Sequence, residues 1–166
     1  MPPETNHIEI TVEINGETVT ESVPVRMHAA DFLRHRLGLT GTHVGCEQGV
    51  CGMCTIMVDG AIVKSCLMLA VQLDGCLVRT VESLADGDRL SALQEAFKHH
   101  HALQCGFCTP AFLTVAKSLE ARAVPPTRAE IREEIAGVLC RCTGYEGIVE
   151  AIAEYLGTPA AEEVAP

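Results

Sequence analysis

The residues best suited to chemistry in this sequence are its cysteines, nine in 166 residues. Two of them, Cys140 and Cys142, stand one residue apart in "LCRCTGYEG", too close to bond comfortably to each other. An odd number leaves at least one cysteine without a disulfide partner, and the N-terminus lacks the basic start and apolar run of a secretory signal. We therefore expect metal ligation or redox chemistry in the cytoplasm, where thiols stay reduced.

The first group of cysteines lies in "GCEQGVCGMC". Cys46, Cys51 and Cys54 follow C-x4-C-x2-C, the spacing with which plant-type ferredoxins hold three corners of a [2Fe-2S] cluster. The glycines beside and between them allow the backbone to pass close to the inorganic sulfurs of a cluster and to direct N-H groups at them. The glycines concerned are Gly45, Gly49 and Gly52.

The fourth ligand of this group follows from the hairpin expected after Cys54. If residues 59-60 form its turn, Thr55 faces Lys64, and the chain returns to Cys54 at residues 65-66. Cys66 is therefore the predicted fourth ligand. Cys76, one strand further on, is the spare cysteine and is expected to be a small buried hydrophobe.

The other four cysteines form a C-x2-C pair and, thirty-one residues later, a C-x-C pair: Cys105, Cys108, Cys140 and Cys142. Cys108 precedes a helix expected to begin at Pro110, and Cys142 precedes one expected to be capped by Thr143. Two helix N-termini would then face one site, where their dipoles favour thiolate charge. The sequence predicts a second four-thiolate site.

The first half of the chain reads as a small sheet around one helix. Residues 8-14 alternate apolar and polar as in a strand, a second strand follows a turn at residues 15-16 and runs through residues 19-23, and residues 27-38 read as a short helix. A hairpin over 55-64 and a strand pair turning at 74-75 complete the sheet.

The second half reads as helices only, which predicts a small bundle and an α+β protein. The expected helices run over 89-101, 110-122, 128-139 and 144-156. Capping boxes are expected at Thr127 with Glu130 and at Thr143 with Glu146. The predicted domains are 1-82 and 83-157, followed by a disordered tail over 158-166.

Composition narrows the possible partners. A net charge of -10 and only 4% aromatic residues argue against nucleic acid binding. No apolar stretch is long enough for a membrane span. No Rossmann fingerprint is present, so any flavin is expected on another chain.

The combination of "GCEQGVCGMC" and Cys66 with "QCGFCTP" and "CRCTGY" resembles the small iron-sulfur subunit of the molybdenum hydroxylases. This family includes xanthine dehydrogenase, aldehyde oxidoreductase and aerobic carbon monoxide dehydrogenase, and the resemblance spans about residues 7 to 156. It implies an N-terminal β-grasp ferredoxin-like domain, a C-terminal four-helix bundle and two [2Fe-2S] clusters. It also implies a large subunit with a molybdopterin cofactor and a medium subunit with FAD, in a heterotrimer or a dimer of heterotrimers.

The resemblance further implies that the chain carries electrons from molybdopterin to flavin. Gln104 would contact the pterin, and Cys140 would lie close to the same ring. The family commonly has glycine after "CTP", where this chain has Ala111, and we expect only a local change in packing against the partner.

Other interpretations remain open on the sequence alone. The chain is alternatively a free-standing ferredoxin-like carrier or, less in keeping with the spacing, a zinc-stabilised interaction module. The run His99-His101 closes a predicted helix, and three consecutive side chains are expected to point in different directions, which argues against a metal there. The substrate of the complex is left open, because an electron carrier does not touch it.

Overall fold

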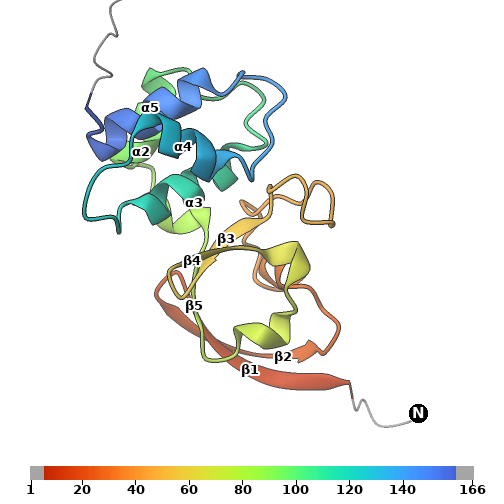
Figure 1. The fold of residues 1–166 in the computed structure, drawn as a ribbon. Coiled ribbons are helices and arrows are strands. Elements are labelled where there is room, and N and C mark those ends of the chain that lie inside the picture. The colour runs from red at the N-terminus through yellow and green to blue at the C-terminus, as the bar shows by residue number, and fades with distance from the viewer. Residues whose placement is uncertain (1–5, 160–166) are drawn as a thin grey trace, which may run out of the picture.

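The computed structural model describes residues 6-159 and shows a sheet-bearing N-terminal part packed against a helical C-terminal part (Figure 1). Each part has its own hydrophobic core. Of the tail expected over 158-166, residues 160-166 lie outside the described residues. Thr158 is held by a hydrogen bond from its hydroxyl to the carbonyl of Pro126, at 2.9 Å.

The N-terminal part contains a five-stranded mixed sheet of order β2-β1-β5-β3-β4. Its strands are β1 (His7–Ile14), β2 (Glu17–Pro24), β3 (Thr55–Val58), β4 (Ala61–Lys64) and β5 (Leu77–Arg79). β1 and β5 are parallel, and the other neighbouring strands are antiparallel. Since β5 lies between β1 and β3, the two hairpins are joined into one sheet.

The sheet wraps a short helix, as the sequence predicts. The helix is α1 (Ala29–Asp31) followed by a π-helical turn over Phe32–Arg36, so it is shorter than the expected 27-38. Phe32 and Leu33 are fully buried in the same core as residues of β1, β3 and β5. The core therefore fixes the start of the loop that carries Cys46.

The sequence predicts two strands that turn at residues 74-75, and the prediction of the first strand is wrong. Residues Ala70–Leu73 form a 3-10 turn, and only β5 follows as a strand. Ala70 and Leu73 are both fully buried, and side chains three residues apart share one face of a 3-10 turn, whereas strand alternation would place them on opposite faces. Further 3-10 turns cover Ser65–Leu67 and Val81–Leu84.

The helical part is built from α2 (Ala92–His99), α3 (Thr109–Leu119), α4 (Arg128–Ile135) and α5 (Glu146–Leu156), which share one core. The capping box at Thr127 and Glu130 is confirmed, with the Glu130 amide donating to the Thr127 hydroxyl at 3.3 Å. The box expected at Thr143 is wrong, because α5 begins after Tyr145. The Thr143 hydroxyl instead accepts the Tyr145 amide and contacts the sulfur of Cys140.

Hydrogen bonds to main-chain carbonyls join the two parts beside the cysteine loops. The amide of Leu139 donates to the carbonyl of Cys51 at 2.9 Å, and the ammonium of Lys64 donates to the carbonyl of Gly137 at 2.8 Å. A methyl group at Gly52 would lie 2.1 Å from that same Gly137 oxygen. The two backbones therefore approach as closely as glycine permits.

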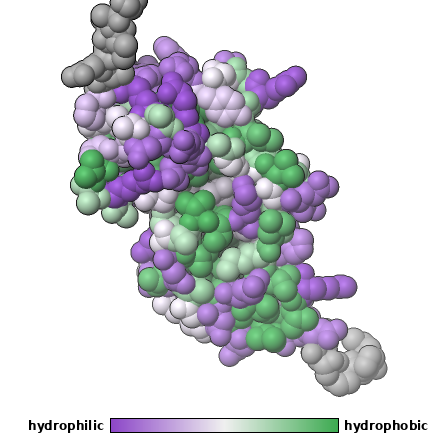
Figure 2. Space-filling view, viewed as in Figure 1, coloured by the Kyte–Doolittle hydropathy of each residue, from purple (hydrophilic) through white to green (hydrophobic). Residues whose placement is uncertain are grey.

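The hydropathy of the surface differs between the two parts. On the face shown in Figure 2, hydrophobic residues gather over the sheet-bearing part and the region where the parts meet, whereas the helical part is largely hydrophilic. No helix within residues 6-159 is long and apolar enough to cross a membrane.

Candidate metal centres

The loop after the π-helical turn holds the first three cysteines. The amides of Gln48 and Cys51 donate to the sulfur of Cys46 at 3.4 and 3.3 Å. These hydrogen bonds lower the pKa of Cys46 to about 6, and the bond from the amide of Cys51 has the larger effect. A methyl group at Gly45 would lie 3.2 Å from the sulfur of Cys51, so the absence of a side chain there lets the backbone pass close to this cysteine.

The hairpin of β3 and β4 has the predicted register, with Thr55 opposite Lys64. Both the amide and the hydroxyl of Ser65 donate to the carbonyl of Cys54, at 3.1 and 2.7 Å. Cys54 and Cys66 are both buried and pack together with Ala30 in one small cluster. Burial is the main cause that raises the pKa of Cys54, to about 11.

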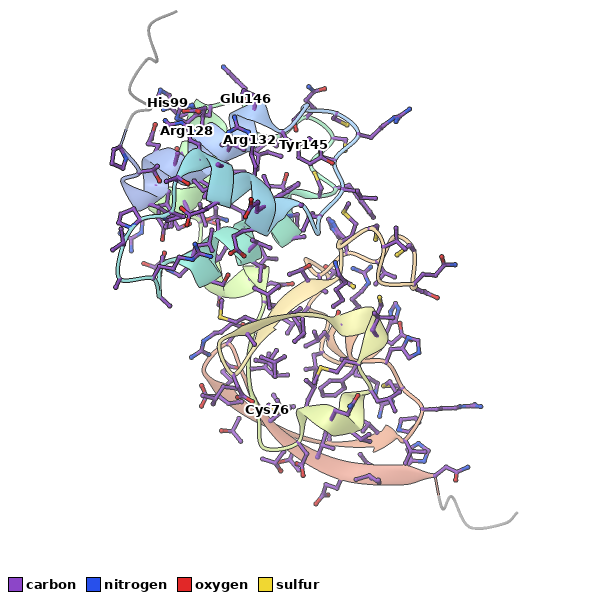
Figure 3. The ribbon with its side chains drawn as sticks, in the orientation of Figure 1. Cys76, His99, Arg128, Arg132, Tyr145 and Glu146 are labelled. Atoms are coloured by element: carbon purple, nitrogen blue, oxygen red, sulfur yellow. The ribbon has the colours of Figure 1, made fainter. Side chains whose placement is uncertain are left out.

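Cys76 lies in the sheet-bearing part (Figure 3) and is not in the cluster of Cys54 and Cys66. Its thiol points at the carbonyls of Gln72 and Asp74, at 3.5 and 3.9 Å, and it packs against the N-terminal core. Cys76 packs against the core as expected of a small hydrophobe, but it is half-buried and not fully buried as predicted.

The second group of four comes together where the C-x2-C loop before α3 meets the loop before α5. The sulfurs of Cys105 and Cys142 are 3.6 Å apart. Cys108 is buried beside Cys140, and burial followed by the contact with Cys140 raises the pKa of Cys108 to about 12. The amides of Cys142 and Thr143 both donate to the sulfur of Cys140, at 3.4 Å.

Two side chains hold this second loop in place. The amide of Cys140 donates to the phenol oxygen of Tyr145 at 2.8 Å, and the side-chain amide of Gln104 donates to the carbonyl of Cys142 at 3.0 Å. α3 begins at Thr109, one residue before the predicted start at Pro110, so Cys108 is its N-cap residue, whereas Cys142 is separated from the start of α5 by a turn. Ala111 is only 1% exposed and packs within the helical core of its own chain.

The sulfurs are grouped in pairs, which distinguishes between kinds of metal centre. A single tetrahedral zinc ion with Zn-S bonds of about 2.3 Å would hold four sulfurs about 3.8 Å from one another. Across residues 6-159, however, no three cysteine sulfurs lie within 4.8 Å of one another. A cluster with two irons takes two thiolates at each iron, so paired sulfurs fit a [2Fe-2S] cluster better than zinc.

Hydrogen-bond donors around the second group also fit an iron-sulfur cluster. Thr109 follows Cys108 directly, and its hydroxyl is buried with no hydrogen-bond partner in the part of the chain that the structure describes. The sulfide ions of a cluster are acceptors for such a hydroxyl and for nearby amides. Burial acts to raise the pKa of Cys140, but the hydrogen bonds from Thr143 and Cys142 outweigh it and lower that pKa, which favours a thiolate ligand.

Sequence analysis missed one contact between the two cysteine loops. The ring of His43 stacks on that of Phe107, with centroids 4.7 Å apart, and His43 Nδ1 lies 2.8 Å from the carbonyl oxygen of Phe107. The two residues are 64 positions apart. Phe107 lies within the "QCGFCTP" motif, but no local pattern links it to His43.

The chain matches two families of iron-sulfur domain. A model of the 2Fe-2S iron-sulfur cluster binding domain matches residues 12–91, and a model of the [2Fe-2S] binding domain matches residues 80–153. The chain is 54% identical over 156 residues to the nicotine 6-hydroxylase small subunit of Paenarthrobacter nicotinovorans, which covers 94% of each chain.

Two further relatives cover nearly the whole chain. The xanthine dehydrogenase iron-sulfur-binding subunit of Escherichia coli O157:H7 is 43% identical, over 89% of this chain and 95% of its own length. In the crystal structure of quinoline 2-oxidoreductase from Pseudomonas putida 86, one chain superposes with a TM-score of 0.88 at 53% identity, over 92% of this chain and 94% of that one. The molybdenum hydroxylases are oxidoreductases whose small iron-sulfur subunits contain two [2Fe-2S]-binding domains and transfer electrons. The chain therefore belongs to the family of these small iron-sulfur subunits.

Proposed function

We propose that this chain carries electrons from a molybdopterin site on a large subunit to FAD on a medium subunit. The observation that supports this most directly is the hydrogen bond at 2.9 Å from the amide of Leu139 to the carbonyl of Cys51. It links a member of the first cysteine group to the residue next to Cys140, a member of the second. The two groups are thus joined by main chain and one hydrogen bond.

The proposed ligands of the first [2Fe-2S] cluster are Cys46 with Cys51 and Cys54 with Cys66. Those of the second are Cys105 with Cys142 and Cys108 with Cys140. When bound, such a cluster takes up and releases one electron at a time. The protein's own part is to hold the thiolates in pairs and to direct amides at Cys46 and Cys140, which tunes the potential of a bound cluster.

We propose the domain boundary near residues 82-83, with a β-grasp ferredoxin-like domain before it and a four-helix bundle after it. The two separate cores support this division. The 3-10 turn Val81–Leu84 lies at the boundary and packs against the helical core through Val81 and Leu84.

Large apolar side chains exposed near the second cysteine group support a partner surface there. Leu103, Phe107 and Leu139 are 42%, 47% and 47% exposed, although apolar side chains of this size are usually buried. We propose that the molybdopterin subunit covers them. Gln104 stands among them, exposed and fixed by its bond to Cys142, and by family resemblance it contacts the pterin.

The first cysteine group is proposed to face the flavin subunit, in a heterotrimer or a dimer of heterotrimers located in the cytoplasm. Val50 and Leu67, beside this group in the sequence, are 63% and 64% exposed.

The relatives named for nicotine, xanthine and quinoline also suggest that the complex oxidises a nitrogen heterocycle. Assays of the complex with such heterocycles and with aldehydes separate these substrate classes.

The order of electron transfer is tested in the purified complex with Cys46→Ser, which removes one ligand of the first group. Rapid-freeze EPR should show the second centre reduced by substrate, while turnover that draws electrons through flavin stops. Cys76→Ser is the matched control and should behave as the wild type. Full flavin-linked turnover in the Cys46→Ser complex would show that the proposed order is wrong.

The remaining alternatives predict different compositions. A free-standing carrier would purify as a monomer without partner chains, whereas the proposed subunit co-purifies with two larger chains. A zinc module would be colourless, whereas two [2Fe-2S] centres contain about four irons and four acid-labile sulfides per chain.

A further inference from the structure

The end of α2 meets α5 in a cluster of two histidines and one glutamate. Nδ1 of His99 lies 3.0 Å from Oε2 of Glu154, and Nε2 of His100 lies 2.6 Å from the same oxygen. The three potential ligand atoms all lie within 4.8 Å of one another, and no other group of three such residues does so in the described part of the chain.

This convergence differs from the expectation that consecutive histidines point in different directions. α2 ends at His99, and His100 is its C-cap residue, with φ -87° and ψ 10°, so the backbone is no longer helical between them. His99 reaches the carboxylate with the ring nitrogen nearer the backbone and His100 with the farther one. The two rings, with centroids 4.8 Å apart, therefore meet at one oxygen, and His101 is not part of the cluster.

We propose that His99, His100 and Glu154 form a binding site for a divalent transition metal, Zn²⁺ in particular, separate from the cysteine groups. Zinc binds imidazole nitrogen and carboxylate oxygen at about 2.0-2.2 Å, which places tetrahedral ligands about 3.4 Å apart. The present separations of 3.0 and 2.6 Å reach that value with shifts of less than about 1 Å. A water molecule would supply the fourth ligand.

The kinds of ligand select the class of metal. Two imidazoles and one carboxylate suit zinc, nickel and copper, whereas magnesium and calcium prefer oxygen ligands only. Each histidine would bind through the nitrogen that now points at the carboxylate. The proton on that nitrogen moves to the other ring nitrogen or to solvent, so both imidazoles bind as neutral ligands.

The place of the site determines its effect. Figure 3 shows His99 on the side of the helical part that lies away from the sheet-bearing part, and no cysteine belongs to this group of ligands. His99 and His100 belong to the end of α2, and Glu154 lies in the last turn of α5. A bound metal would thus join the ends of these two packed helices and stabilise the helical part.

The test measures zinc by mass spectrometry after equilibrium dialysis of the cluster-loaded chain in its complex. The wild type should bind one more Zn²⁺ per chain than the His100→Gln variant, with no loss of iron. His99→Gln and Glu154→Gln should each weaken binding by at least about tenfold, since loss of even an outer contact to a metal ligand costs that much. The side chain of His99 is 70% exposed, so this variant is not expected to disturb folding.

His101→Asn is the matched control. His101 has φ of 49°, a conformation that asparagine tolerates, and it should retain the full zinc content. Equal zinc in the wild type and in His99→Gln would overturn the proposal. Zinc uptake that expels iron and is unaffected by His100→Gln would overturn it too, because the metal would then be bound by the cysteines.

Discussion

Gly52 offers the sharpest test of how the two parts of the molecule are joined. Its φ is +73°, and a methyl group there would lie 2.1 Å from the carbonyl oxygen of Gly137 and 2.8 Å from the Cα atom of Val138. These are backbone atoms, which cannot rotate away. Gly52→Ala therefore forces the loop and the helical part to separate.

The expected loss of stability has two contributions. The left-handed conformation costs alanine about 1 kcal/mol relative to glycine. Separation by about 1 Å weakens the bonds from Leu139 to Cys51 and from Lys64 to Gly137, and two hydrogen bonds contribute about 2 kcal/mol together. The total of about 3 kcal/mol lowers the Tm of a chain of this size by roughly 6-12 °C.

Gly60→Ala is the control, measured by thermal unfolding of the cluster-loaded chain. Gly60 has φ of +83°, but a methyl group there meets nothing within 4 Å. It should lose only the conformational contribution, or about 2-4 °C. If the two variants melt at the same temperature, the close approach at Gly52 does not hold the parts together and the reasoning is refuted.

Two further predictions concern the cysteines and an ion pair. Cys66→Ser should reduce the iron content from about four to about two atoms per chain, whereas Cys76→Ser should leave it unchanged. Visible spectra and iron analysis measure this difference. The reverse result would show that Cys76, and not Cys66, is the ligand. The bidentate hydrogen bond from Arg128 lowers the pKa of Glu150 below its usual 4.5, so the pair stabilises the fold above that pH and loses its effect as pH falls through the lowered pKa. Glu150→Gln should lower stability by about 1 kcal/mol at pH 7 and by progressively less below pH 4.5; a constant difference between the two proteins would contradict this assignment.

Local sequence patterns predicted the elements that depend on neighbouring residues. The turn at residues 59-60 was sufficient to predict that Thr55 faces Lys64, and the capping box at Thr127 was sufficient to start α4. Both signals act within a few residues, so no knowledge of the rest of the fold is needed. The assignment of Cys66 as a ligand rests on that register and remains a prediction.

The features that sequence analysis missed depend on distant residues. The start of α5 moved because the Thr143 hydroxyl contacts Cys140 and accepts the Tyr145 amide instead of capping the helix. Besides the predicted approach of its backbone to cluster sulfur, Gly52 also brings the loop close to Gly137, 85 positions away in the chain, which no local pattern predicts. Such contacts become visible only when the two parts are packed together.

The hydrogen bond from the amide of Leu139 to the carbonyl of Cys51 has a consequence for how the sequence of this protein can change. The amide of Leu139 makes its hydrogen bond whatever side chain residue 139 carries, and only proline removes that donor. The exposed side chain at this position, which we propose the partner covers, is therefore free to diverge as the partner diverges, while the spacing of the two cysteine groups stays constant. The constraint falls on Gly52, where the requirement is for no side chain at all.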